Sequence, residues 1–264
     1  MSEFRLLKIM GQAINDYDML NEGDRVVVGV SGGVDSIALL LLLHKRLSYI
    51  PSKYEIFPVF VDKFNGENSA YNEKVENFSK FIKENTGLDL NVIHLPIISF
   101  LSTSSIPKRN YCYACANKRR AEILKFAKSI NANKVAFAHH KDDIIQTSLM
   151  NVFYKRELST MLPRLPIFNG AIEIIRPLSY LTKKEIEKYI LCYKVEVPVI
   201  EEYCPLKIFN RNSRREEIKN LIEELEKKFP NIKNNIFAAF RNPKPDYLLN
   251  YLFNPKTTAR FKRP

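Results

Sequence analysis

The chain has 264 residues, a formal net charge of +12 and four cysteines. A chain of this length can bury a sizeable core, as one large domain or as one domain with a small appendage. It contains no stretch of about 18 apolar residues, and its N-terminal sequence lacks the pattern of a signal peptide. We therefore expect a cytoplasmic protein with no membrane partner. Its cysteines are expected to serve metal or redox chemistry rather than a disulfide framework.

The excess of positive charge predicts a polyanionic partner, most simply a nucleic acid. A basic proteome would produce the same excess, so the charge alone leaves both explanations open. Clusters of basic residues favour the nucleic acid: Lys108 with Arg109, Lys118 with Arg119 and Arg120, Arg211 with Arg214 and Arg215, and a tail with Lys256, Arg260, Lys262 and Arg263.

The first predicted strand and helix are joined by a glycine-rich turn. Residues 25–30 form an apolar run typical of a buried strand, and residues 34–47 follow a helical pattern. Between them, Gly32 and Gly33 let the backbone approach a ligand closely. The start of the helix offers free N–H groups and a partial positive charge, which suit a phosphate. An ordinary tight turn is the alternative.

The side chains of this turn add hydroxyl groups from Ser31 and Ser36, and Asp35 is placed to orient the turn or to hold a metal ion. Neither the phosphate-loop motif G-x-x-x-x-G-K-[ST] nor G-x-G-x-x-G is present. The run Ser-Gly-Gly-Val-Asp-Ser instead resembles the S-G-G-x-D-S signature of the PP-loop ATP pyrophosphatases, which split ATP into AMP and pyrophosphate. This resemblance implies that the phosphates of ATP rest on Ser31, Gly32, Gly33, Asp35 and Ser36.

Strand and helix patterns continue to alternate along the chain. Further strands are predicted at residues 54–62, 90–96, 134–138 and 172–175, and helices at residues 72–85, 114–130, 142–156 and 182–192. Residues 99–111 are predicted to be a polar loop, and from residue 214 the pattern is helical and charged. We predict an α/β fold with a doubly wound parallel sheet over residues 1–200 and a helical C-terminal extension over residues 201–264.

Several polar residues follow predicted strands directly. Because ligands bind at the carboxyl ends of strands in such sheets, we expect Asp62, His139 and His140 to share one edge with the glycine-rich turn. We assign Asp62 and His139 to nucleotide binding. His140 is assigned to contact with nucleotide or substrate during catalysis, and Asp143 to magnesium or to support of the loop. Ordinary capping of a helix N-terminus is the alternative for Asp142 and Asp143.

Three cysteines are candidates for metal binding. Cys112 and Cys115 form a CxxC pair at the start of a predicted helix, where a lowered thiol pKa favours the thiolate. This spacing fits a zinc site, a redox pair, an iron–sulfur ligand pair or two buried thiols. Cys204 lies in a predicted loop, and three thiolates would leave one coordination position open. Cys192 lies in an apolar helix stretch and is predicted to be a small core residue.

From the CxxC onward the chain resembles the tRNA 2-thiocytidine synthetases and their 2-thiouridine relatives. With the glycine-rich turn, the resemblance spans residues 23–249, with its motifs in the same order. These motifs are the CxxC with Arg119 and Arg120 after it, Ala-His-His-Lys-Asp-Asp at 138–143, Ile-Arg-Pro-Leu-Ser-Tyr at 175–180, Cys-Pro at 204–205 and Asn-Pro-Lys-Pro-Asp-Tyr-Leu-Leu at 242–249.

The resemblance implies an ATP-dependent tRNA sulfurtransferase. Such an enzyme adenylates the C2 oxygen of a pyrimidine, here an anticodon-loop cytidine, and replaces it with sulfur. The resemblance further implies Mg²⁺ and a [4Fe–4S] cluster held by Cys112, Cys115 and Cys204, with the fourth iron open to the delivered sulfur. The sulfur donor would be a cysteine desulfurase or free sulfide. A homodimer is also suggested by the resemblance, although the sequence itself leaves it open.

The chain departs from the family pattern at several positions. Val34 replaces the lysine of the family loop S-G-G-K-D-S, so a cation must come from elsewhere or is dispensable. Ala138 replaces a glycine, and Asp246 with Tyr247 replaces Ser-His. The paired-cysteine zinc modules of the thiouridine branch are missing, which favours the thiocytidine side. The alternatives are a 2-thiouridine synthetase, a cluster-free ligase such as a lysidine synthetase, and a zinc-stabilised RNA-binding module without catalysis.

The remaining polar and aromatic candidates each have two interpretations. Arg176 is placed to reach a phosphate or to form a structural salt bridge. Tyr111 and Tyr113 are candidates for stacking on a base, or for the core. Residues 183–188 are interpreted as a solvated helix face.

Overall fold

The structure is a computed structural model and describes residues 2–192, 197–200, 205 and 214–244. Cys204, the basic tail after residue 244 and most of the last family motif lie outside these ranges. None of the helices within them is long and apolar enough to cross a membrane.

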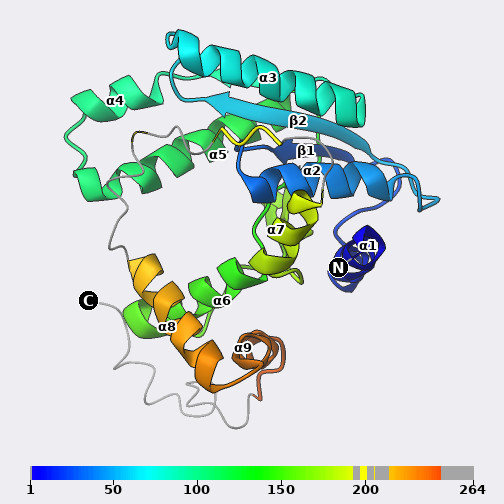
Figure 1. Cartoon of the computed structure of the whole chain (residues 1–264), viewed down its shortest axis with the longest axis vertical. Coiled ribbons are helices and arrows are strands. Elements are labelled where there is room, and N and C mark those ends of the chain that lie inside the picture. Colours follow the sequence, from blue (N-terminus) through cyan, green and yellow to red (C-terminus); the bar gives the residue numbers. More distant parts are fainter. Residues whose placement is uncertain (1, 193–196, 201–204, 206–213, 245–264) are drawn as a thin grey trace.

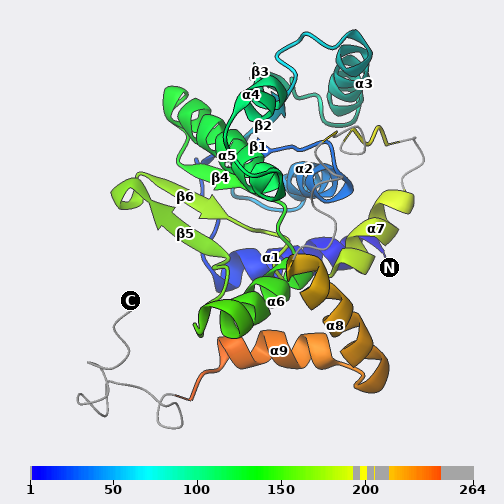
Figure 2. The same ribbon diagram turned by 90° about the vertical axis from the view of Figure 1, so that its left-hand side faces the viewer.

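The described residues form one sheet of six strands in the order β3-β2-β1-β4-β6-β5, which can be followed in Figure 2. Figure 1 shows β1 and β2 of this sheet, with α3 on the far side of β2 from β1. Neighbouring strands are parallel except β5 and β6, which pair antiparallel at one edge. The order reverses at β1, because the chain passes outward through β2 and β3 and returns to place β4 on the other side. The strands are β1 (Arg25–Gly29), β2 (Glu55–Asp62), β3 (Asn91–His94), β4 (Lys134–Ala136), β5 (Arg164–Ile167) and β6 (Ile172–Ile175).

Helices cover both faces of the sheet, as predicted. Successive strand side chains point to opposite faces, so Val26 and Val28 join a core with α1, α2, α3 and α7, whereas Val27 joins a core with α4 and α5. The helices are α1 (Glu3–Asp16), α2 (Val34–Arg46), α3 (Ser69–Thr86), α4 (Ile97–Thr103), α5 (Tyr111–Ser129), α6 (Lys141–Met150), α7 (Lys183–Leu191), α8 (Arg214–Lys228) and α9 (Ile232–Arg241), with 3₁₀ turns Lys108–Asn110 and Phe168–Gly170 and a π turn Asn151–Lys155.

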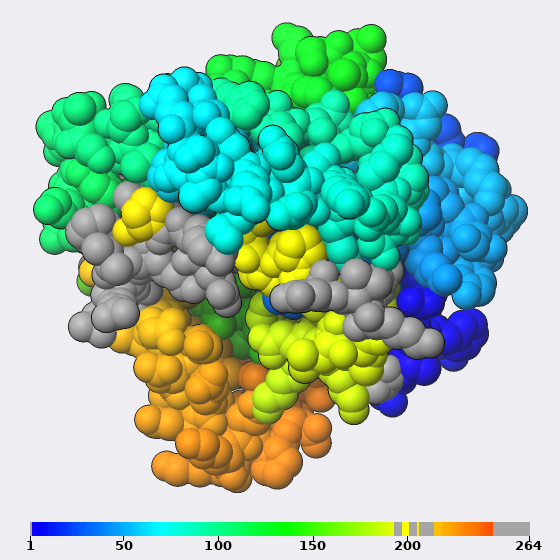
Figure 3. Space-filling view, turned by 45° about the horizontal axis from the view of Figure 1, so that its top comes forward, coloured from blue at the N-terminus to red at the C-terminus, as the bar shows by residue number. Residues whose placement is uncertain are grey.

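The C-terminal helices form a small core of their own on α6. Ile218 and Ile222 of α8 and Phe237 of α9 are buried against Ile144 and Ile145. Figure 3 shows α8 and α9 (orange) beside α7 (yellow-green), at the opposite end of that face from α3 (cyan). The predicted helical extension is therefore confirmed for the described residues 214–244, and it is packed against the sheet domain through α6.

The prediction of a polar loop over residues 99–111 is wrong. This segment contains the end of α4 and a 3₁₀ turn. Ile97 and Leu101, four residues apart, are buried on one face of α4. The hydroxyl groups of Ser102 and Thr103 donate to carbonyls one turn back, over 2.9 and 3.1 Å. Serine and threonine hydroxyl groups, which favour a loop when read from the sequence alone, thus donate to backbone carbonyls within a helix.

Two further details differ from the sequence prediction. Cys192 is exposed at the end of α7 and is not a core residue. Strand β5 was not predicted, because Pro166 interrupts its pattern. Proline is tolerated there since β5 is an edge strand.

Lys134 provides a test of the sheet's buried charges. Its ammonium pairs with Glu173 and lies 3.8 Å from Asp24, and its side chain is 6% exposed. Lys134→Met should lower the free energy of unfolding by about 2 kcal/mol, because it leaves the buried Asp24 without its nearby ammonium and leaves Glu173 with Arg164 as its remaining cation. Urea unfolding measures this loss. The matched control Lys80→Met, at a side chain 73% exposed, should stay within about 0.5 kcal/mol of wild type. Equal free energies of unfolding for the two variants would contradict the stabilising role of Lys134.

Candidate active site

The turn between β1 and α2 has the backbone expected of a phosphate-binding loop. Gly32 has a φ of +79°, and a Cβ there would lie 3.0 Å from the Cβ of Ile200. The Ile200 N–H donates to the Gly32 carbonyl over 2.9 Å. Gly33 is the N-cap of α2. The N–H of Ser36 donates to the Gly33 carbonyl over 3.1 Å, whereas Val34 and Asp35, the first two residues of α2, precede the first carbonyl that the helix can offer. Their N–H groups suit an anion.

The two serines of the loop define its shape. The Ser36 hydroxyl donates to the Gly33 carbonyl over 2.8 Å and accepts from the Ser31 N–H over 3.0 Å. The hydroxyl oxygens of Ser31 and Ser36 lie 3.2 Å apart. Ser36 is buried, so its first role is to hold the loop closed on itself.

The loop forms one wall of a cleft of about 440 Å³. A second wall consists of Phe137, Ala138 and His139, which follow β4. The cleft therefore lies where β1 and β4 separate, the point at which the strand order reverses. Ligands of doubly wound sheets bind at such points.

One stripe of α5 forms the opposite wall. Helix residues four apart share a face, so Cys112 lies on this stripe one turn before Ala116. Because α5 begins at Tyr111, three residues earlier than predicted, Cys112 stands in its first turn and Cys115 directly after that turn. The α5 residues that line the cleft are Ala116, Arg119, Arg120 and Ile123.

The chemistry of this helix start fits metal-binding thiolates. Cys112 is half-buried and Cys115 is buried, and both are thiols rather than disulfide sulfurs. Cysteine sulfur is a ligand that suits iron–sulfur clusters or zinc. The Nε of Arg119 is buried without a hydrogen-bond partner in the described part of the chain.

The described residues hold two of the three predicted cysteine ligands. Among them no group of three or more His, Cys, Asp or Glu side chains is arranged to hold a metal ion. Cys204, the predicted third ligand, lies outside the described ranges. Cys112 and Cys115 therefore fit as two ligands of a cluster that needs a further thiolate.

His139 presents a neutral imidazole to the cleft. Its Nδ1 accepts a hydrogen bond from Nε of Arg176 over 3.3 Å, which assigns the ring proton to Nε2. Burial, and then the positive charge of Arg176, lowers the pKa of His139 to about 4. Arg176 also donates to the Leu162 carbonyl, so its observed role is to hold His139 in place.

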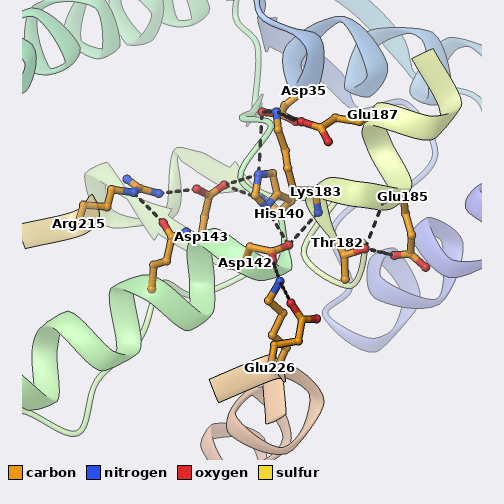
Figure 4. A network of polar contacts seen from close by, with 12 residues as sticks. Asp35, His140, Asp142, Asp143, Thr182, Lys183, Glu185, Glu187, Arg215 and Glu226 are labelled. Atoms are coloured by element: carbon orange, nitrogen blue, oxygen red, sulfur yellow. Dashed lines mark hydrogen bonds and ion pairs between the residues drawn. The ribbon is translucent and has the colours of Figure 1, made fainter. Parts of the chain in front are cut away.

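His140 connects α6 to the phosphate loop (Figure 4). It is the N-cap of α6, and its side chain is 8% exposed. Its Nε2 lies 3.4 Å from Asp143 and 3.9 Å from Asp35, and its Nδ1 lies 3.6 Å from Asp142. The Asp143 carboxylate also accepts from the His140 N–H over 2.9 Å. The structure is therefore compatible with both interpretations of Asp142 and Asp143, as residues that cap the start of α6 and as residues of the site.

Each of these carboxylates has a basic partner from α7, α8 or α9 (Figure 4). The sequence patterns did not indicate these partners, and the interpretation of Lys183 as a solvated residue is wrong. Lys183 is 148 residues from Asp35, so local spacing carries no signal of the contact. The pairs are Lys183 with Asp35 at 2.8 Å, Lys233 with Asp142 at 3.1 Å, and Arg215 with Asp143.

Asp62, a predicted site residue, makes contacts that stabilise the local fold. Its carboxylate is 1% exposed, lies 2.9 Å from Nδ1 of His94, and accepts the N–H groups of Phe64 and Gly66. These contacts fix the turn after β2. The assignment of Asp62 to nucleotide binding stays a prediction.

The two tyrosines beside the cysteines differ in exposure. Tyr111 is 7% exposed and belongs to the core on the α4 and α5 face. Tyr113 is 73% exposed. Of the two stacking candidates, Tyr113 is therefore the one placed to meet a base.

The PP-loop domain family matches residues 3–222. Among the relatives, the tRNA-cytidine(32) 2-sulfurtransferase of Burkholderia multivorans is 32% identical over 97% of this chain and 74% of its own. That of Pseudomonas putida is 33% identical over 92% of this chain and 85% of its own. The chain belongs to this family of PP-loop enzymes. The family assignment made from the sequence motifs is therefore confirmed.

A solved structure supports the fold. The U34-tRNA thiolase of Methanococcus maripaludis, with its [4Fe–4S] cluster, matches with a TM-score of 0.63 and 21% identity. The match covers 90% of this chain and 78% of the thiolase. The predicted PP-loop α/β fold is thus confirmed by both family membership and architecture.

We expect His139 to destabilise the protein in acid. Its pKa is lowered from 6.5 to about 4, so the folded state resists a proton that the unfolded state accepts. The stability linked to the neutral ring is present above about pH 6.5 and is lost as the pH falls toward about 4. In urea unfolding, any advantage of wild type over His139→Asn should shrink, or reverse, over this range. A difference independent of pH would contradict the prediction.

Proposed function

We propose that the chain is an ATP-dependent tRNA sulfurtransferase that converts a cytidine to 2-thiocytidine. The observation that carries this proposal is the single cleft shared by the phosphate loop and the stripe of α5 that bears Cys112. The names of the relatives support a tRNA cytidine, at position 32, as the substrate. The net charge of +12 supports tRNA as a partner.

The first step is activation of the base. The loop from Ser31 to Ser36 is proposed to hold the triphosphate of ATP through its N–H groups. The C2 oxygen of the cytosine attacks the α-phosphorus, pyrophosphate leaves, and AMP remains bonded to that oxygen. Arg119, Arg120 and Arg215, which line the cleft, are placed to neutralise the charge that develops on phosphate.

The carboxylates of the cleft are the proposed magnesium ligands. Asp35 and Asp143 both line it, and carboxylate oxygens together with phosphate oxygens are the usual ligands of Mg²⁺. His140, which lies between these aspartates, is proposed to keep their orientation during catalysis. His139 is proposed to contact the nucleotide as a neutral hydrogen-bond donor.

The second step is replacement of oxygen by sulfur. Cys112, Cys115 and Cys204 are proposed to hold a [4Fe–4S] cluster, which when bound would present sulfide from the sulfur source to C2 of the activated base. AMP is then the leaving group. Tyr113 is proposed to stack on a base of the anticodon loop, which must be splayed out for the reaction. A cysteine desulfurase or free sulfide is the proposed sulfur source.

The surrounding proposals rest on the family resemblance. We propose a cytoplasmic protein, a homodimer, and a division into a PP-loop domain over residues 1–200 and a C-terminal extension over residues 201–264 that carries the third cysteine and the basic tail.

Reconstitution tests the whole proposal. Protein purified without oxygen should contain iron and sulfide, and with ATP, a sulfur source and unmodified tRNA it should release pyrophosphate and form 2-thiocytidine. Mass spectrometry of digested tRNA identifies the product. Iron-free protein that transfers an amine to tRNA would identify a cluster-free ligase instead. Zinc-containing protein that binds tRNA without releasing pyrophosphate would identify a binding module.

Single substitutions should separate the two steps. Ser36→Ala opens the loop and should lower tRNA-dependent pyrophosphate release by about 100-fold or more. Cys112→Ser should abolish thiolation while the rate of tRNA-dependent pyrophosphate release stays within a few-fold of wild type. The exposed Cys192 offers a matched control, and Cys192→Ser should leave both steps unchanged. Loss of thiolation in Cys192→Ser equal to that in Cys112→Ser would contradict the assignment.

A further inference from the structure

The phosphate loop of this chain lacks a cation of its own. Val34 occupies the first position of α2, where the related loops carry lysine, and its side chain packs against the main core. The acidic side chain of the loop is Asp35, which lines the cleft. A polyphosphate entering a loop with a carboxylate and no ammonium would meet a net negative charge, which costs binding free energy.

Lys183 brings an ammonium group to this loop from α7. Its Nζ donates to both carboxylate oxygens of Asp35, each over 2.8 Å (Figure 4). The Lys183 side chain is 36% exposed and that of Asp35 is 29% exposed. The pair is therefore partly exposed and is not a buried structural bridge. Asp35 lines the cleft, whereas Lys183 lines a neighbouring hollow with His140 and Asp142, so Lys183 acts on a ligand in the cleft through Asp35.

The position of Lys183 is fixed by local structure. It is the first residue of α7, directly after the N-cap Thr182 and inside the capping box that Thr182 forms with Glu185. Its backbone N–H donates to Asp142 over 2.8 Å, which ties the start of α7 to the start of α6. The ammonium group is thus held at the loop by two helix starts rather than by a flexible segment.

Other basic side chains near the cleft have different positions or partners. Arg119 and Arg120 stand on the opposite wall, on α5. Arg215 donates to Asp143 and Gln146. Within the described ranges, Lys183 is the lysine or arginine paired directly with the phosphate loop.

We propose that Lys183 is the relocated cation of the phosphate loop, a positioning residue that neutralises Asp35 and holds it for ATP. The proposal rests on the proposed function in that ATP is taken as the ligand. It accounts for the valine at position 34, because a lysine there and one at position 183 would serve the same carboxylate.

Binding of ATP by four purified proteins tests this proposal without tRNA or sulfur. Lys183→Met should weaken ATP binding, measured by titration calorimetry, by about tenfold or more, the size of a lost charge-assisted hydrogen bond. The double variant Val34→Lys/Lys183→Met should recover at least half of the lost binding, because it returns a cation to the loop. The control Lys184→Met, at a neighbouring side chain that is 80% exposed, should bind as wild type.

Thermal unfolding without ATP separates binding from folding. If Lys183→Met is too unstable to measure, Lys183→Gln takes its place in the same comparison. In turnover, Lys183→Met should raise the KM for ATP more than it lowers kcat. Wild-type ATP affinity in Lys183→Met, tighter binding of Mg²⁺–ATP, or a loss that Val34→Lys does not restore would each overturn the proposal. Absence of thiolation with lysine-dependent ATP binding would refute the proposed function and leave the role of Lys183 standing.

Discussion

The parallel pairing of β1 with β4 is the constraint on which the rest of the site depends. Residues 26–28 lie beside residues 134–136 in register, so both strands end at the same edge of the sheet. At the end of β1, a Cβ on Gly29 would lie 3.0 Å from the ring of Phe137, closer than an ordinary van der Waals contact. This close approach places the phosphate loop beside His139 and opens the cleft that α5 closes from the other side.

Helices α7, α8 and α9 are connected to the site by ion pairs. Three aspartates at the loop and at the start of α6 each pair with a basic side chain from α7, α8 or α9, and His140 lies among them. Such partly buried pairs hold geometry more than they add stability. These ion pairs therefore join the phosphate loop and the start of α6 to the helices after residue 182. Through them Asp35 has a neutralising cation, although the loop lacks its usual lysine.

The features that could be predicted from the sequence are those that local patterns encode. Sequence patterns predicted the strand, the two adjacent glycines and the helix of the phosphate loop, and also the capping box at Thr182 and the CxxC. Each of these features depends on neighbours a few residues away. The contact of Lys183 was missed, since it spans 148 residues, and residues 99–111 were misread, since hydroxyl groups there bond within a helix. Cys192 was misplaced because an apolar neighbourhood in sequence does not fix which helix face is buried.

In the proposed function, the phosphate loop and the cysteine-bearing helix α5 act on one tRNA base. Mass spectrometry of tRNA nucleosides from a strain without this gene tests it most directly. We predict that 2-thiocytidine disappears in this strain and returns with the wild-type gene, but not with the Ser36→Ala or Cys112→Ser variant. Unchanged 2-thiocytidine in the deletion strain, or loss of a different modified nucleoside alone, would contradict it.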